Sequence, residues 1–168
     1  MLSFNPTLWF VLQVVPKMEI HVAAALRGKG YEEFLPMYKQ RRRWSDRVKV
    51  VDLPLFPGYV FCRFIRDSDA LVVTTPGVRR ILGFGARPQA VGDDEMESLR
   101  KVVGSRMDIL PCPFHMGQKV RIEDGPLMGV VGTLIRTKNR QRFVVSIEIL
   151  MRSVAVDVEA HNLSTRVV

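Results

Sequence analysis

Apolar positions follow different periods along the chain, and each period predicts one kind of element. Residues 9–15 are mostly β-branched or aromatic and precede Pro16, which predicts a first strand that ends at the proline. From residue 17 apolar side chains recur at helical spacing, which predicts a helix. The helix is expected to end near Gly28 and Gly30, because glycine often follows the last turn of a helix. The inward face of this helix is expected to carry Met18, Val22, Ala25 and Leu26.

Residues 31–64 predict a long hairpin followed by a strand with two different faces. Residues 31–38 have an extended pattern, and residues 39–49 are a polar segment that predicts the tip of the hairpin. Pro57-Gly58 is then expected to interrupt the pairing of the strands with a bend or bulge. After this bend Tyr59, Phe61 and Arg63 alternate with residues of the opposite face. The face that packs on the helices is predicted to carry Phe10, Leu12, Val14, Val60, Cys62 and Phe64. The other face needs a second cover or a partner.

The following segment predicts two more helices and a linker. Residues 67–75 predict a short helix, Pro76-Gly77 a turn and residues 78–82 a strand. Asp93 has the character of a helix N-cap. That helix is expected to turn Met96, Leu99 and Val103 inward. Residues 105–116 lose all periodicity and contain Pro111 and Pro113, which predicts a linker.

Residues 117–168 predict a separate unit of short strands. Val120 and Ile122 alternate with charged residues, and further strands are expected at residues 130–136, 143–150 and 154–158. Short strands at this spacing, without a helix, predict a small barrel of about five strands. The chain is therefore expected to contain two domains, residues 7–104 and 117–168.

The charge of the chain favours a polyanionic partner, because it contains 25 Lys and Arg but only 17 Asp and Glu, which gives a net charge of +8. Cys62 and Cys112 lack metal-ligand spacing, and so few cysteines favour a reducing cytoplasm. His21, His115 and His161 are scattered, and no nucleophile or phosphate-loop motif occurs. No enzyme activity, cofactor or metal is predicted. No apolar run approaches the roughly 20 residues of a membrane span, so no membrane partner is expected.

Two motifs together resemble the NusG family. Leu55-Phe-Pro-Gly-Tyr-Val-Phe61, with residues 9–13 upstream and 75–78 downstream, resembles the N-terminal (NGN) domain of that family. Residues 117–126, followed by Gly129 and Gly132, are similar to its KOW motif. The resemblance implies an α+β fold in which a four-stranded antiparallel sheet with flanking helices precedes a five-stranded SH3-like KOW barrel.

The resemblance also implies a function in transcription elongation or antitermination. Family members dock an apolar depression of the first domain on the clamp helices of RNA polymerase, which suppresses pausing. Their barrel recruits a small-subunit ribosomal protein or the terminator Rho. Antiterminator paralogues act on selected operons, and the stretch from Tyr38 to Phe64 resembles those paralogues somewhat more than the general factor. The sequence leaves open whether this chain is a general or an operon-specific factor.

The candidates for polymerase binding are four aromatic residues and one glutamine. Tyr59 and Phe61 share one sheet face, and an uncovered aromatic cluster there would mark an interface. The predicted polymerase-binding residues are Gln13, Phe56, Tyr59, Phe61 and Phe84. The alternative is that these rings fill the domain's own core.

The polar arm at residues 39–49 is the candidate for nucleic-acid contact. An Arg-rich hairpin tip with an aromatic ring suits phosphate contact and base stacking. The predicted contact residues are Arg41, Arg42, Arg43, Trp44, Arg47 and Lys49. The family resemblance implies that they lie near the upstream DNA fork and the non-template strand. The alternative is a solvated charged face.

Apolar residues of the barrel are the candidates for partner recruitment. They are expected to be exposed, and they are Leu127, Met128, Ile149, Leu150 and Met151. Met151 stands where many relatives have glycine, which changes local bulk and backbone freedom. The alternative is that these side chains cap the barrel's own core.

A second interpretation of the whole chain is a KOW-containing ribosomal or RNA-binding protein. Binding to core RNA polymerase distinguishes the two interpretations. If the chain is a NusG-like factor, it is expected to be a bacterial cytoplasmic monomer that associates with the nucleoid through the polymerase.

Overall fold

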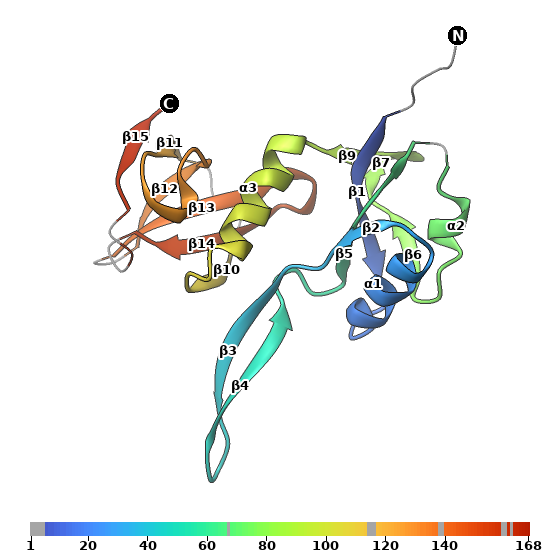
Figure 1. Ribbon diagram of the computed structural model, residues 1–168, viewed down its shortest axis with the longest axis horizontal. Coiled ribbons are helices and arrows are strands. Elements are labelled where there is room, and N and C mark those ends of the chain that lie inside the picture. The colour runs from blue at the N-terminus through green and yellow to red at the C-terminus, as the bar shows by residue number, and fades with distance from the viewer. Residues whose placement is uncertain (1–5, 67, 114–116, 138–139, 159–160, 162) are drawn as a thin grey trace. The chain divides into compact units, whose positions relative to one another are not determined.

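The computed structural model describes residues 6–66, 68–113, 117–137, 140–158, 161 and 163–168 (Figure 1). The chain forms two compact units, each built from two segments. The first comprises Met1–Leu35 and Phe56–Asp93, and the second comprises Pro36–Leu55 and Asp94–Val168. The fold is mixed, with few helices and many strands. The domain boundaries expected from the sequence stay a prediction.

The first unit is built on an antiparallel sheet in the order β2-β5-β1-β6, with β9 also paired to β1. Its strands are β1 (Thr7–Val14), β2 (Glu32–Phe34), β5 (Tyr59–Ile65), β6 (Val78–Ile81) and β9 (Ala90–Val91). The family resemblance implied four strands. The fifth strand, β9, has only two residues, and a segment of that length is too short to show a pattern of alternation.

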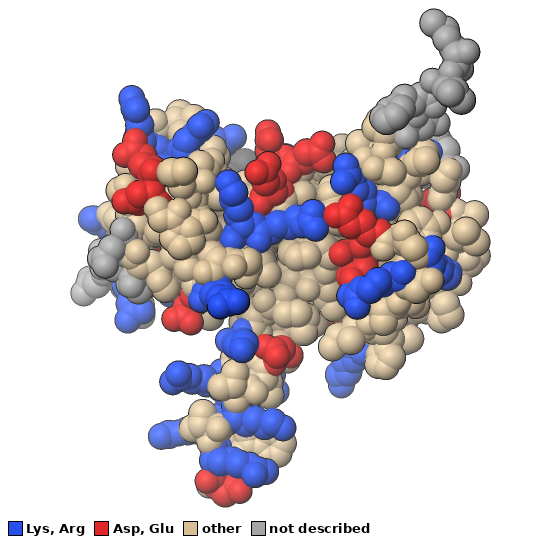
Figure 2. Space-filling model, in the orientation of Figure 1, with Lys and Arg blue, Asp and Glu red and all other residues tan. Residues whose placement is uncertain are grey.

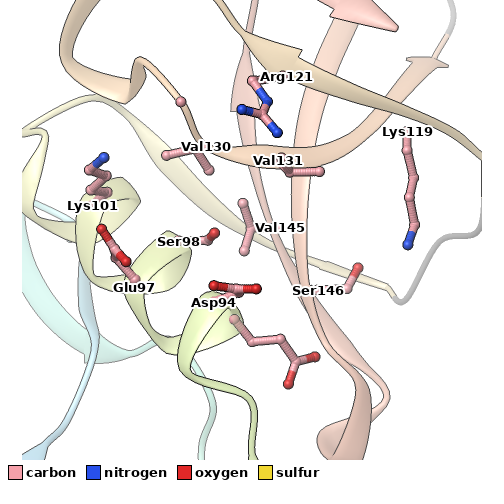
Figure 3. Close-up of a pocket in the computed structure, with 12 residues that line it drawn as sticks. Asp94, Glu97, Ser98, Lys101, Lys119, Arg121, Val130, Val131, Val145 and Ser146 are labelled. Carbon is pink, nitrogen blue, oxygen red and sulfur yellow. The ribbon is translucent and has the colours of Figure 1, made fainter. Parts of the chain in front are cut away.

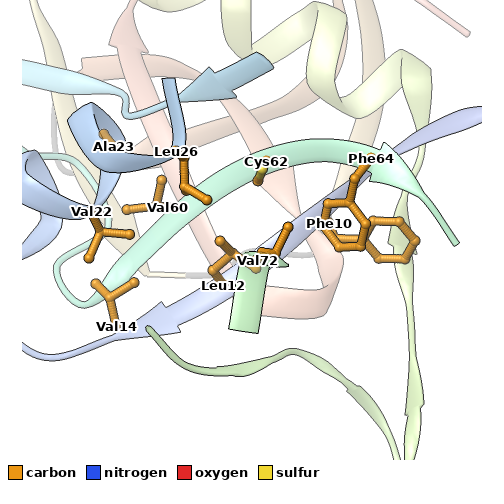
Figure 4. Close-up of a cluster of buried hydrophobic side chains, with 10 residues drawn as sticks. All are labelled: Phe10, Leu12, Val14, Val22, Ala23, Leu26, Val60, Cys62, Phe64 and Val72. Atoms are coloured by element: carbon orange, nitrogen blue, oxygen red, sulfur yellow. The ribbon is translucent and has the colours of Figure 1, made fainter. Parts of the chain in front are cut away.

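One face of this sheet packs on α1 (Glu19–Gly28) and α2 (Ala70–Val73), as the core in Figure 4 shows. The alternating residues of β1 and β5 supply the strand side of the core, because every second side chain points to the same face. These core residues are Phe10, Leu12, Val14, Val60, Cys62 and Phe64, as predicted, together with Val22, Ala23, Leu26 and Val72 from the helices. Phe10 and Phe64 stack with ring centroids 4.4 Å apart.

The second unit contains an antiparallel sheet in the order β10-β14-β13-β12-β11-β15. Its strands are β10 (Ile109–Pro113), β11 (Gln118–Ile122), β12 (Val131–Thr137), β13 (Arg140–Ile147), β14 (Arg152–Asp157) and β15 (Thr165–Val167). Two single-turn helices, η1 (Gly125–Leu127) and η2 (Glu148–Leu150), lie between strands.

The linker prediction for residues 105–116 is wrong where β10 forms. Pro111 and Pro113 were expected to break any element, yet they pair with Val154 and Arg152 of β14. β10 is the end strand of the sheet, and proline is tolerated on an edge strand because the missing N–H is not needed by a further neighbour. Residues 114–116 of the predicted linker lie outside the described residues.

The helix α3 (Asp93–Gly104) begins with Asp93 itself, one residue earlier than an N-cap role for Asp93 predicts. Met96 and Leu99 are buried as expected, but Val102 is the third fully buried residue and Val103 is only partly buried. Val102 lies about 60° from Leu99 around the helix axis. The buried stripe of α3 is therefore wider than the sequence pattern predicted.

The second unit also contains the predicted hairpin, a two-stranded ribbon formed by β3 (Met37–Arg43) and β4 (Val48–Pro54) (Figure 1). The backbone N–H of Leu55 donates to Pro36 O at 2.8 Å at its base, and Trp44 N donates to Arg47 O at 2.8 Å in its turn. Residues 39–50 are all exposed. The ribbon therefore keeps its shape through its own ladder and not through a core.

Candidate functional site

The aromatic group at the start of β5 is largely buried. Phe56 and Phe61 meet edge to face with centroids 6.1 Å apart, and Phe34 lies 6.2 Å from Phe61. Phe56 and Phe61 are buried, so the expectation of an open ring-lined face is wrong for these two. Tyr59 is half-buried. The binding role predicted for these residues stays a prediction.

Phe84 is the exposed ring of the predicted group. It belongs to a short hairpin of β7 (Gly83–Phe84) and β8 (Arg87–Pro88), and 77% of its surface is exposed. Gly83 permits this tight hairpin, since a Cβ at this position would lie 2.0 Å from the carbonyl oxygen of Arg87. The hairpin holds an aromatic side chain in solvent, as an interface residue requires.

Gln13 lies at the centre of a polar row across three strands. It is the Cα partner of Tyr59 on β5 and of Arg80 on β6, so the three side chains share one face. The side-chain oxygen Oε1 of Gln13 accepts a 2.7 Å hydrogen bond from Arg80 Nε. The sequence alone does not reveal this role of Arg80, because the two residues are 67 positions apart and only the strand register joins them.

Glu19 positions the bend that precedes Tyr59, and the sequence analysis did not identify it. Its buried carboxylate accepts a 2.8 Å hydrogen bond from Gly58 N. Gly58 has φ 85°, a left-handed conformation that favours glycine. The first turn of α1 therefore fixes the chain between Phe56 and Tyr59.

The ribbon carries the predicted basic residues, and Figure 2 shows Lys and Arg side chains along it. Residues 37–54 contain six Lys or Arg and two Asp, a net charge of +4 that is half the charge of the whole chain. Trp44 is exposed in the turn, and Lys49 Nζ lies 5.9 Å from its ring centroid. The structure thus brings the charged residues and the ring onto one exposed element.

Only two of the five barrel candidates are exposed. Leu127 and Leu150 are buried and Ile149 is partly buried, so the expectation that all five are exposed is wrong. Met128 and Met151 are 62% and 64% exposed. Both follow single-turn helices that direct the preceding leucine inward.

A cavity of about 460 Å³ lies in the second unit between α3 and the strands β11 to β13 (Figure 3). Asp94 and Glu97 line it from the helix, and Lys119 and Arg121 line it from β11. The lining therefore carries both signs of charge. Among the described residues no group of three or more His, Cys, Asp or Glu is placed to hold a metal ion.

The two cysteines have the environment of thiols and not of thiolates. Burial raises the pKa of the Cys62 thiol to about 12, and the Glu33 carboxylate adds to the increase. Partial burial also raises the pKa of Cys112, although the charge of Arg142 opposes the increase. Cys62 is a small buried side chain of the core, as predicted.

A mixed α/β protein with an exposed basic ribbon has the features of a protein that binds a polyanion. A family model described as "Transcription termination factor nusG" matches residues 7–100, more than half of the chain. The chain belongs to the NusG family. No helix among the described residues is long and apolar enough to span a membrane.

Named relatives agree with this family. The transcription termination/antitermination protein NusG of Vibrio cholerae is 28% identical over 173 residues, covering 90% of this chain and 91% of the relative. The protein of the same name from Neisseria meningitidis is 28% identical over 169 residues, covering 90% and 93%. A solved structure of Thermotoga maritima NusG has the same fold, with a TM-score of 0.51 and 20% identity over 96% of this chain and 93% of that one.

Proposed function

We propose that this protein is a transcription elongation or antitermination factor that binds RNA polymerase and catalyses no reaction itself. The observation that carries the proposal is the family match over residues 7–100, which contains the segment from Leu55 to Phe61. The names of the relatives, which contain both termination and antitermination, support the same class of function.

The proposed polymerase-binding surface lies on the first unit and contacts the clamp helices. Tyr59, Gln13 and Phe84 supply side chains that reach solvent at least in part. Phe56 and Phe61 are buried and pack against each other, so their proposed contribution is to support the surface and not to contact the polymerase. Binding at this surface would suppress pausing.

The remaining elements take the other proposed roles. The ribbon, with its exposed cations and Trp44, contacts DNA at the upstream fork or the non-template strand. The strands β10 to β15 form a KOW barrel of the SH3-like kind, and Met128 and Met151 contact a small-subunit ribosomal protein or Rho. The protein acts in the bacterial cytoplasm as a monomer.

The test is binding of the full chain to immobilised bacterial core RNA polymerase. Tyr59→Ala combined with Phe84→Ala should weaken binding at least tenfold, because aromatic side chains dominate the energy of interfaces. Phe61→Ala is unsuitable, since removing a buried ring would destabilise the unit by about 3–5 kcal/mol.

Ile20→Ala is the matched control, because Ile20 is an exposed apolar residue on α1. It should leave the affinity unchanged. Equal effects of the two changes would reject the surface. Retention of the wild-type chain by ribosomal assemblies but not by core polymerase would reject the function and favour the ribosomal interpretation.

A further inference from the structure

The strand register divides the ribbon into two faces with different chemistry. Arg41 is the Cα partner of Val50 and Arg43 is the partner of Val48, so these four residues share one face, the Arg–Val face. Arg42 is the partner of Lys49 on the opposite face, which also carries Gln40 and Val51. The basic residues that the sequence treats as one group therefore belong to two surfaces.

The Arg–Val face is the face whose polar groups are not engaged within the ribbon. Among the described residues, Arg41 and Arg43 form no ion pair and no side-chain hydrogen bond. On the opposite face, Arg42 Nε donates to Gln40 Oε1 at 3.3 Å, and Lys49 lies over the Trp44 ring. The guanidinium groups of the Arg–Val face are thus available to an external ligand.

Exposed valines accompany these arginines. Val48 is 59% exposed and Val50 is 52% exposed, and the methyl groups have no core to enter because the ribbon has none. Each arginine of β3 on this face therefore lies opposite a valine of β4. A ligand that fits this face must offer hydrogen-bond acceptors and apolar methyl groups at close spacing.

The major groove of duplex DNA offers that combination. Guanine presents two acceptors that an arginine binds with both arms of its guanidinium group, and thymine presents a methyl group. The groove is about 12 Å wide and admits a two-stranded ribbon, whereas the corresponding groove of an RNA duplex is too narrow. Strands of seven residues extend about 23 Å, enough to follow the groove across several base pairs.

We infer that the Arg–Val face binds in the major groove of duplex DNA and discriminates between sequences there. This inference rests on the proposed contact between the ribbon and DNA, and it names the form of the DNA and the face that binds it. Arg41 and Arg43 bind guanine edges, and Val48 and Val50 contact thymine methyl groups. The opposite face contributes charge without base discrimination.

The first experiment compares two double variants of the full chain by fluorescence anisotropy, with no polymerase present. The probe is the 20-base-pair duplex that the wild-type chain enriches most strongly from a randomised pool. Both R41A/R43A and R42A/K49A remove two cations from the same ribbon, so a purely electrostatic contact loses equal affinity in each. We expect R41A/R43A to lose at least ten times more affinity than R42A/K49A.

Circular dichroism must show that both variants are folded. Equal losses would overturn the inference, as would the absence of any enriched sequence. Tighter binding to an RNA duplex of the same sequence, or to the separated DNA strands, would also overturn it.

A second comparison tests the methyl contacts. Replacing thymine by uracil in the probe should weaken wild-type binding about fourfold for each methyl group that is contacted. The variant V48S/V50S keeps the charge but removes the valine methyl groups, and it should bind the two probes with more nearly equal affinity. Wild-type binding that ignores the substitution would contradict the role of the valines.

Binding of R41A/R43A to core RNA polymerase without nucleic acid separates this inference from the proposed function. The variant should bind the polymerase like the wild type. If wild-type chain fails to bind polymerase but discriminates between duplexes, the proposed function fails while the inference stands. If polymerase binding is intact and the two double variants lose equal DNA affinity, only the inference fails.

Discussion

At the scale of single residues, Met151 combines a backbone that favours glycine with a side chain in solvent. Its φ of 48° and ψ of 42° lie in the left-handed region, which costs a residue with a Cβ about 1–2 kcal/mol. The relatives' glycine at this position, implied by the sequence resemblance, removes that cost. An exposed methionine at an unfavourable backbone position is consistent with the proposed contact role.

Met151→Gly should raise the free energy of unfolding by about 0.5–1 kcal/mol, because relief of the left-handed strain outweighs the small packing loss. Urea denaturation followed by circular dichroism measures the change. Met151→Ala is the control, since alanine keeps the Cβ and should not stabilise. A gain of the same size in both variants would show that the side chain, and not the backbone, is responsible.

The cysteines give a second prediction at this scale. At pH 8 a thiol reagent should modify Cys112 in the native protein and should reach Cys62 only after unfolding, because Cys62 is buried and its pKa is about 12. Counting reactive thiols with and without denaturant measures this. Cys112→Ser should abolish the native reaction, and rapid native modification of that variant would contradict the burial of Cys62.

The same shift has a consequence for stability at high pH. The folded pKa of Cys62 lies above its ordinary value of 9.0, so the contribution of the protonated thiol to stability is complete below pH 9. That contribution is lost as the pH rises from 9 toward 12.

At the scale of elements, the start of α1 and the bend before β5 act together. Glu19 is buried, and its carboxylate accepts the hydrogen bond from Gly58 N across 39 positions of sequence. Removal of the carboxylate leaves a backbone N–H without its acceptor, and such a group is costly to bury.

Glu19→Ala should therefore lower the free energy of unfolding by about 1–3 kcal/mol. Glu19→Gln keeps an oxygen acceptor and should lose less. Thermal unfolding of the two variants beside the wild type checks the order. Equal destabilisation by the two changes would indicate that the negative charge near the helix start matters more than the hydrogen bond.

The elements also show how far sequence alone predicts this structure. Alternation in β1 and β5 predicted the core face from Phe10 to Phe64, because a side-chain period of two leaves little freedom. It did not predict the burial of Phe61, since alternation assigns a residue to a face without saying what covers that face. The link between Gln13 and Arg80 needed the strand register, which no local pattern contains.

β10 shows a different limit of prediction. Prolines at positions 111 and 113 disfavour a strand in the middle of a sheet. The linker prediction failed because the segment forms an edge strand, where proline is tolerated. Edge position is a property of the whole sheet and cannot be read from a short segment. The six strands that result make the second unit larger than the sequence predicted.

At the scale of the whole molecule, the place of β10 determines where the second unit can be separated from the chain. Five residue pairs join β10 to β14, and Ile109 is buried. A fragment of residues 105–168 should therefore unfold at a higher temperature than a fragment of residues 117–168. Circular dichroism melts of the two fragments measure the difference. Equal melting temperatures would show that β10 adds nothing to the unit.

The alternation of side chains in the two-stranded ribbon has a consequence for how this protein can change over evolution. Because neighbouring side chains point to opposite sides, a substitution at Arg42 alters one surface and leaves the chemistry of the other intact. Insertion or deletion of a single residue in either strand would instead exchange the two surfaces along part of its length. Selection should accordingly tolerate new residue types in this segment far more readily than a new number of residues.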